Sequence, residues 1–169
     1  MFQVGESVVC PGYGAGRVMG ISKVSCLGTD KRYYAIELLD GTGTEVWVAV
    51  RDAEDKGVRR PTPPARLSEV WRLLCAAPQD LPADYTKRYV IIRERIGHGD
   101  LGQIARALRD LWWKNGHVRR LTMEGKRLYD KALSLLATEV GISEGVDREA
   151  AADEILQRLQ ESQAARPVA

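Results

Sequence analysis

The sequence is poor in the residues that usually build metal sites and disulfides. It has three cysteines, Cys10, Cys26 and Cys75, and two widely separated histidines, His98 and His117. No C-x-x-C pair is present, whereas a zinc site needs four ligands at short, paired spacings. We therefore expect no metal, no other cofactor, and reduced cysteines that pack as small buried residues.

Long apolar runs are also absent. No stretch approaches the roughly 20 apolar residues that are needed to cross a bilayer, and 28% of the residues are charged. The first residues, MFQVGESVV, lack both the basic start and the uninterrupted apolar segment of a secretion signal. We expect a cytoplasmic monomer that does not enter a membrane.

Recognisable catalytic motifs are missing as well. Gly12, Gly14, Gly16 and Gly20 have a spacing that fits neither a P-loop nor a dinucleotide fingerprint, and a strand rather than a helix is predicted after them. We assign these glycines to tight turns of a barrel. No G-x-S-x-G is present, and Cys75 falls in a predicted amphipathic helix. The sequence offers no catalytic residues, so we do not expect an enzyme.

The pattern of the first sixty residues predicts short strands separated by tight turns. Alternating apolar and polar residues are interrupted by the turn sequences at 11–14 and 40–43. Four or five strands in so short a chain predict a small β-barrel over residues 1–60. Such a barrel is too small for a deep active site and typically presents an edge strand or a shallow groove to a partner.

A proline-rich linker at 61–64 separates this barrel from a helical region. Three prolines in four residues interrupt both sheet and helix hydrogen bonding. Beyond the linker, apolar residues recur with helical spacing, which predicts a second domain of about five helices over residues 65–162 and a frayed tail over 163–169.

Several helix ends are predicted from local signals in this second domain. Asp100 with Gln103 resembles a capping box that opens a helix, which Asn115–Gly116 is expected to close. Thr122 is predicted to cap the start of a helix that runs through Val140 and is ended by Gly141. Asp147 is predicted to cap the start of a last helix that reaches Gln160.

Positive charge is concentrated in the middle of the chain. Residues 85–131 hold twelve Lys or Arg against five Asp or Glu, a balance of +7 in a chain whose total is +2. Residues 1–60 are neutral, and residues 132–169 carry a balance of -4. Aromatic residues interrupt the basic region, as expected of a surface that contacts phosphates and bases.

One predicted helix in this region suggests a nucleic-acid contact. Between Pro82 and Gly97, four apolar residues fall within about 60° of one another, while three cations lie on a different face. Either Tyr85 is a core residue and the cations are merely solvated, or Tyr85 is exposed and stacks on bases beside phosphate-binding cations. The apolar residues are Tyr85, Tyr89, Ile92 and Ile96, and the cations are Lys87, Arg88 and Arg95.

The rest of the basic region offers weaker candidates. Trp112 lies on the apolar stripe of its helix and is expected in the core, whereas Trp113 is turned about 100° away from that stripe. Arg119 and Lys126 flank the predicted cap at Thr122, where backbone amides and cations together can receive a phosphate. A solvated turn explains these two cations equally well.

Several segments of the sequence resemble one family in the same order. These segments are VGESVVCPGYGAGRVMGI at the start, KGVRR at 56–60, DYTKRY at 84–89, LRDLWW, and LTMEGKRLYDKALSLLATEV. Together they resemble the CarD/CdnL family of bacterial transcription regulators over nearly the whole chain. The resemblance implies two domains of β and α type, the first a small SH3-like or Tudor-like barrel and the second all-α.

The resemblance also implies partners. In that family the barrel binds the β subunit of RNA polymerase, and the helical domain contacts promoter DNA at the upstream edge of the melted -10 region. Family members often carry arginines on the polymerase-facing strands. The matching positions here are Val24 and Trp47, with Lys23 and Val48 beside them. This surface is therefore expected to be more apolar than usual, and the protein is expected to reach the nucleoid through the polymerase.

On the DNA side, the family's wedge residue is typically a tryptophan before a Ser/Thr and a basic pair. The matching residue is Tyr85, followed by Thr86, Lys87 and Arg88, and a further DNA-facing basic position falls on Lys126. Tyrosine offers less stacking area than tryptophan and a hydroxyl that prefers water, so we expect a weaker wedge.

Two other functions are compatible with the sequence. One is a protein-only adaptor whose basic helical domain binds an acidic protein, and the other is a small enzyme that uses the glycine turns. We expect a transcription regulator without sequence-specific operator recognition, because no helix-turn-helix pattern is found.

Overall fold

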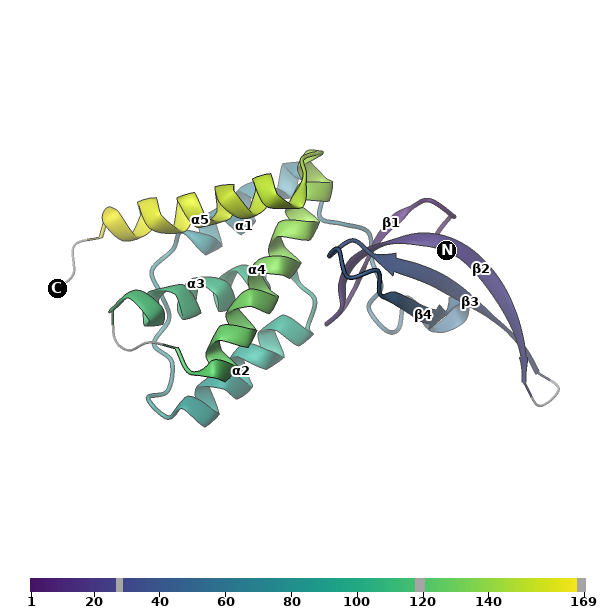
Figure 1. Cartoon of the computed structure of the whole chain (residues 1–169), viewed down its shortest axis with the longest axis horizontal. Coiled ribbons are helices and arrows are strands. Elements are labelled where there is room, and N and C mark those ends of the chain that lie inside the picture. The colour runs from purple at the N-terminus through teal and green to yellow at the C-terminus, as the bar shows by residue number, and fades with distance from the viewer. Residues whose placement is uncertain (27–28, 118–120, 167–169) are drawn as a thin grey trace. The chain divides into compact units, whose positions relative to one another are not determined.

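The computed structural model describes residues 1–26, 29–117 and 121–166, and it separates the chain into two compact units, Met1–Pro61 and Thr62–Ala169. The first unit is a curled antiparallel sheet, and the second consists of helices (Figure 1). The expected combination of a small Tudor-like β domain and an all-α domain is confirmed.

The first unit contains four described strands, β1 (Ser7–Cys10), β2 (Gly14–Cys26), β3 (Thr29–Leu38) and β4 (Glu45–Ala49), which pair in chain order. A short 3-10 helix, η1 (Val50–Asp52), follows them. Alternate residues of the strands face a small apolar core. There the Phe2 ring meets Tyr34 edge-on at 5.7 Å, and the Tyr34 hydroxyl accepts a hydrogen bond from the Phe2 amide. This contact fastens the N-terminal segment to the sheet.

The glycines of the first unit have two roles. Gly12 and Gly14 have positive φ values of 75° and 110° at the β1–β2 turn, as predicted. Gly16 and Gly20 lie inside β2, so their assignment to turns is wrong. A Cβ on Gly16 would lie 2.6 Å from the Ile36 side chain. Gly16 therefore allows β2 and β3 to approach closely, a contact between strands that turn propensities do not describe.

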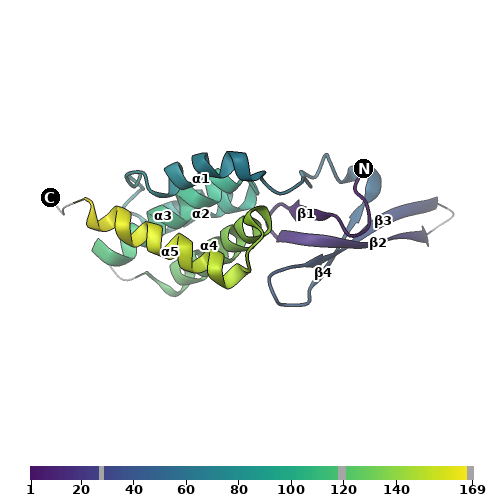
Figure 2. The same cartoon turned by 90° about the horizontal axis from the view of Figure 1, so that it is seen from above.

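The second unit contains a 3-10 helix, η2 (Pro64–Arg66), and five α-helices in its described part: α1 (Leu67–Leu74), α2 (Tyr85–Gly97), α3 (Leu101–His117), α4 (Met123–Glu144) and α5 (Arg148–Ala164). The helix α3 contacts all four of the others. Seen from above, its ribbon runs between those of α1 and α5 (Figure 2), and both of these helices lie on the same side of it in Figure 1. The buried faces form one continuous apolar core. No helix in the described ranges is both long and apolar enough to cross a bilayer.

The helix starts follow the sequence signals more closely than the helix ends. Asp100, Thr122 and Asp147 each accept a hydrogen bond from the backbone amide three residues later, as expected of N-caps. Three predicted ends are too early. The helix α3 continues through Asn115–Gly116 and ends at His117, and α4 continues beyond Gly141 to Glu144. The helix α5 continues beyond Gln160 to Ala164, so it includes two residues of the predicted tail.

The end of α4 shows why Gly141 misled the prediction. A Cβ at Gly141 would lie 2.9 Å from the Val146 carbonyl oxygen, so this glycine accommodates the returning chain. The left-handed residue that stops the helix is Gly145, with φ 72° and ψ 30°. Close packing and helix termination both favour glycine, and local sequence does not separate the two causes.

Candidate nucleic-acid interface

The helix α2 starts with an exposed turn that carries Tyr85. The Asp84 carboxylate caps it by accepting hydrogen bonds from the Thr86 and Lys87 amides, at 2.7 and 3.1 Å. Tyr85 is 62% exposed, although its apolar stripe continues into the core through Tyr89, Ile92 and Ile96. Of the two interpretations of this helix, the structure agrees with the one in which the Tyr85 ring lies outside the core.

Tyr89 connects Tyr85 to the start of α4. The Tyr85 and Tyr89 rings are 6.5 Å apart at 56°, and the Tyr89 hydroxyl lies 2.8 Å from the Thr122 hydroxyl. Thr122 in turn caps α4 by accepting a hydrogen bond from the Gly125 amide. A Cβ on Gly125 would lie only 2.5 Å from the Tyr89 hydroxyl oxygen. The junction of Tyr89, Thr122 and Gly125 therefore fixes the N-terminal halves of α2 and α4 against each other.

Three of the predicted DNA-binding cations lie beside this junction. Lys87 is exposed in the first turn of α2, and Lys126 is exposed next to Gly125 in α4. Arg88 is half-buried, with its guanidinium 5.7 Å from the centre of the Tyr89 ring and 3.4 Å from the Ala83 carbonyl oxygen. The two helices thus place Tyr85, Lys87, Arg88 and Lys126 around one pair of helix starts.

Arg95 has a different environment from the one predicted. Its guanidinium donates to the buried carboxylate of Asp110 at 2.7 Å and to the Gln79 side-chain oxygen at 2.6 Å. The Arg95 side chain is only 16% exposed. It is therefore held inside the helical unit, and a role in phosphate binding would require this ion pair to open. Arg119, the remaining predicted DNA contact, lies outside the described residues.

The regional charge excess overstates the free positive charge. Of the twelve cations in residues 85–131, Arg93 pairs with Glu124, and Arg95 and Arg109 pair with Asp110. The described cations of α2 and α4 that have no ion pair are Lys87, Arg88, Lys126, Arg127 and Lys131. Such a set can hold a few phosphates and supplies attraction without base recognition.

The two tryptophans of α3 are both half-buried. Trp112 donates from its indole nitrogen to the Gln163 side-chain oxygen at 2.9 Å and stacks on Tyr129, with ring centres 6.4 Å apart. Burial raises the pKa of the Tyr129 hydroxyl. Trp112 thus packs against the core, close to its expected position, and also ties α3 to α5. Trp113 lines an open pocket together with residues 78–81 of the α1–α2 connection.

In the first unit, the four predicted polymerase-binding residues do not share one face. Trp47 and Val24 are 50% and 42% exposed, and the strand register places both on the outer face of the sheet. Val48 is buried in the core, so it does not form part of an exposed surface as it stands. Lys23 lies on the opposite face from Val24 and pairs with Asp30 at 3.4 Å. Adjacent residues of a strand point to opposite faces, which separates these two pairs.

The two outer strands of the sheet differ in how their edges are covered. The outer edge of β1 forms a bridge in which Val9 and Arg59 exchange two backbone hydrogen bonds. Within the described ranges, β4 pairs only with β3. Its free edge lies next to Trp47 and is able to accept a further strand.

A pocket of about 490 Å³ lies in the first unit, away from the glycine turns. It is lined by the N-terminal residues, the start of β3 and the chain around η1, and none of the four candidate glycines contributes to it. In the parts of the chain that are described, no three His, Cys, Asp or Glu side chains are grouped to hold a metal ion.

Comparisons with known proteins assign this arrangement to a family. The model of the CarD-like/TRCF RID domain matches residues 2–61, and the model of the CarD C-terminal domain matches residues 69–156. The chain belongs to the CarD family. CarD-family membership confirms the resemblance seen in the sequence and identifies the protein as a transcription regulator.

A curated relative supports the same assignment. "Putative transcription factor YdeB" of Bacillus subtilis is 25% identical to this CarD-family chain over 146 residues, which span 86% of the chain and 94% of that protein. The likeness therefore extends across both units.

Two features of the site were not predicted from the sequence. The junction of Tyr89, Thr122 and Gly125 depends on contacts of Tyr89 with residues that are 33 or more positions away. Asp110 is 1% exposed and binds two arginines. The one local signal for Asp110 is an adjacent pair of opposite charges, Arg109–Asp110, within an otherwise apolar stretch of α3.

Proposed function

We propose that this CarD-family protein binds RNA polymerase through residues 1–61 and stabilises the open promoter through the starts of α2 and α4. Tyr85 is the residue that distinguishes open from closed DNA, by stacking at the junction between duplex and melted strands. Lys87, Arg88 and Lys126 hold the neighbouring phosphates. The observation that carries this proposal is the exposed Tyr85 ring, backed by Tyr89 and surrounded by cations from two helices.

The mechanism is thermodynamic linkage. A protein that binds the open complex better than the closed one shifts the equilibrium by at most the difference between the two binding free energies. One stacked aromatic residue contributes about 1–3 kcal/mol. Phosphate contacts contribute similarly to closed and open DNA, so they raise affinity without shifting the equilibrium much.

The outer face of the first unit is the proposed polymerase contact. Trp47 and Val24 are exposed there, and the free edge of β4 lies beside Trp47. These features suit a partner in the polymerase β subunit that offers an apolar surface and an extended strand. Lys23 and Val48 are not expected to contribute directly, because they lie on the other face.

The DNA contact is tested with fluorescence anisotropy on a fork-junction DNA and on a blunt duplex of the same sequence. We expect Tyr85→Ala to lower the preference for the fork by about 5- to 150-fold and to leave duplex binding nearly unchanged. Tyr13→Ala is the matched control, because Tyr13 is 60% exposed but lies in the first unit. Equal fork preference for Tyr85→Ala and Tyr13→Ala would refute the wedge.

The polymerase contact is tested by capture of the purified β subunit with the full-length protein. Trp47→Ala is expected to weaken capture by tenfold or more, since large aromatic residues dominate such interfaces. Val4→Ala is the control, because Val4 is an exposed apolar residue of the same unit. Normal β-subunit capture with no salt-dependent DNA binding would favour the protein-only adaptor.

A further inference from the structure

The connection between α1 and α2 leads directly into the proposed DNA contact. It comprises residues 75–84 and contains no helix, and its last residue, Asp84, caps the turn that carries Tyr85. The first three residues of α2 are all exposed, so core packing does not hold that turn. The position of Tyr85 therefore depends on what holds the connection, in addition to the ring contact with Tyr89.

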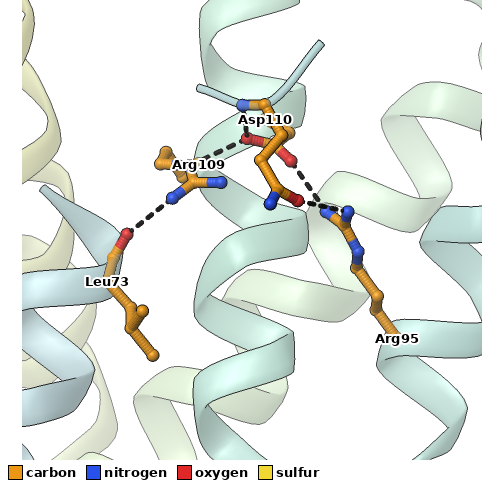
Figure 3. Close-up of polar contacts among 5 residues, drawn as sticks. Leu73, Arg95, Arg109 and Asp110 are labelled. Carbon is orange, nitrogen blue, oxygen red and sulfur yellow. Dashed lines mark hydrogen bonds and ion pairs between the residues drawn. The ribbon is translucent and has the colours of Figure 1, made fainter. Parts of the chain in front are cut away.

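The buried carboxylate of Asp110 holds the connection between α1 and α2. Asp110 in α3 accepts hydrogen bonds from the Gln79 amide at 3.0 Å, from Arg95 at 2.7 Å and from Arg109 at 2.8 Å. Arg95 also donates to the Gln79 side chain, and Arg109 donates to the Leu73 carbonyl oxygen at the end of α1. Figure 3 shows Asp110 between the two arginines, with Leu73 beyond Arg109. The end of α1, the connection and α2 are thus joined at two adjacent side chains of α3, because Arg109 binds α1 while Asp110 binds the connection, α2 and Arg109 itself.

Packing alone does not fix the connection at this point. Pro78, Gln79, Asp80 and Leu81 line an open pocket of about 280 Å³ together with Asp110, Trp113 and Lys114. Leu81 is buried in the core, but the residues before it lie beside open space. Close packing normally restricts a segment to one position, and an open pocket relaxes that restriction. Hydrogen bonds to Asp110 therefore have an unusually large share in placing the segment.

We propose that Asp110 is a positioning residue for the DNA contact, which it orients through Gln79 and Arg95 without touching DNA. This inference rests on the proposed function, because it assumes that Tyr85 contacts melted DNA. Asp110 belongs to a group with two positive charges and one negative charge in a largely buried site. Removing the carboxylate leaves two arginines facing each other, which separates α2 from α3 and shifts the connection.

The test compares Asp110→Asn with Asp153→Asn in the full-length protein, on the fork and duplex DNAs described above. Both variants raise the net charge by one, but Asp153 is exposed on α5. We expect Asp110→Asn to lower the fork preference by at least about threefold, part of what the stacked ring contributes, without weakening duplex binding. Asp153→Asn should keep the fork preference of the original protein. Equal fork preference for the two variants overturns the proposal.

Arg95→Gln distinguishes positioning from direct contact, and it also serves if Asp110→Asn fails to fold. If Arg95 acts through Asp110, fork preference falls while the salt dependence of duplex binding is unchanged. If Arg95 binds a phosphate, the slope of log affinity against log salt falls by about one while fork preference is kept, which overturns the proposal.

Failure of this inference can be told apart from failure of the proposed function. If Tyr85→Ala lowers the fork preference but Asp110→Asn and Arg95→Gln do not, the wedge stands and the positioning role is wrong. If Tyr85→Ala has no effect on fork binding, both the wedge and the positioning role are wrong.

Discussion

Gly125→Ala tests whether the junction of α2 and α4 determines both stability and DNA binding. The added methyl group would lie 2.5 Å from the Tyr89 hydroxyl oxygen and 3.1 Å from its ring carbon Cζ, so Tyr89 must move. Such overpacking costs about 1–3 kcal/mol. The loss of the Tyr89–Thr122 hydrogen bond adds about 1 kcal/mol, and the better helix propensity of alanine returns about 1 kcal/mol. The expected net loss in the free energy of unfolding is about 1–3 kcal/mol.

Urea unfolding followed by circular dichroism at 222 nm measures this loss, because the α-helices belong to the second unit. Gly97→Ala is the matched control, since Gly97 also lies in a helix and its added Cβ would meet no atom within 4 Å apart from its chain neighbours and the backbone of its own helix. That variant is expected to be as stable as the original or slightly more so. Fork preference should also fall for Gly125→Ala, because Tyr89 supports the Tyr85 ring. If both alanine variants unfold at the same urea concentration, the reasoning about the junction is refuted.

Three further predictions follow from single residues. Burial raises the pKa of the Cys10 thiol to about 11, so this cysteine should react with a thiol reagent at pH 8 only after unfolding, and rapid labelling of the native protein would contradict its burial. Burial, with the nearby Glu154 carboxylate, raises the pKa of Glu144 above 4.5, so its ionised form opposes folding. The loss of folding stability caused by ionised Glu144 therefore appears as the pH rises above 4.5. Glu144→Gln should therefore melt at a slightly higher temperature than the original protein at pH 7, with no gain below pH 4. Tyr85→Trp should increase fork preference, because tryptophan offers more stacking area, and an unchanged preference would show that ring size does not limit the wedge.

Local signals in the sequence were sufficient for much of the fold. Caps such as Thr122 and Asp147 act through hydrogen bonds within three residues, so a short stretch of sequence contains both partners. The exposure of Tyr85 also agreed with one of the two predicted interpretations, since the stripe of α2 extends one turn beyond the core.

Other features depend on partners that are distant in the sequence. Arg95 was predicted at the DNA surface because its helical face is basic, but its partner Asp110 lies in the next helix. Val48 is a different kind of error. Adjacent residues of a strand point to opposite faces of the sheet, so Val48 and Trp47 cannot both lie on one surface. The sequence alone was enough to exclude that pairing.

The small number of free cations has a consequence for how the two units cooperate. Three arginines in the basic region are engaged in ion pairs, which leaves few side chains on α2 and α4 to hold phosphates. A few phosphate contacts give weak binding that falls steeply with salt. Attachment to polymerase through the first unit would hold the second near the promoter at an effective concentration in the millimolar range. In the proposed mechanism, weak intrinsic affinity would be an advantage, because the protein would discriminate between closed and open DNA through Tyr85 without binding duplex DNA elsewhere.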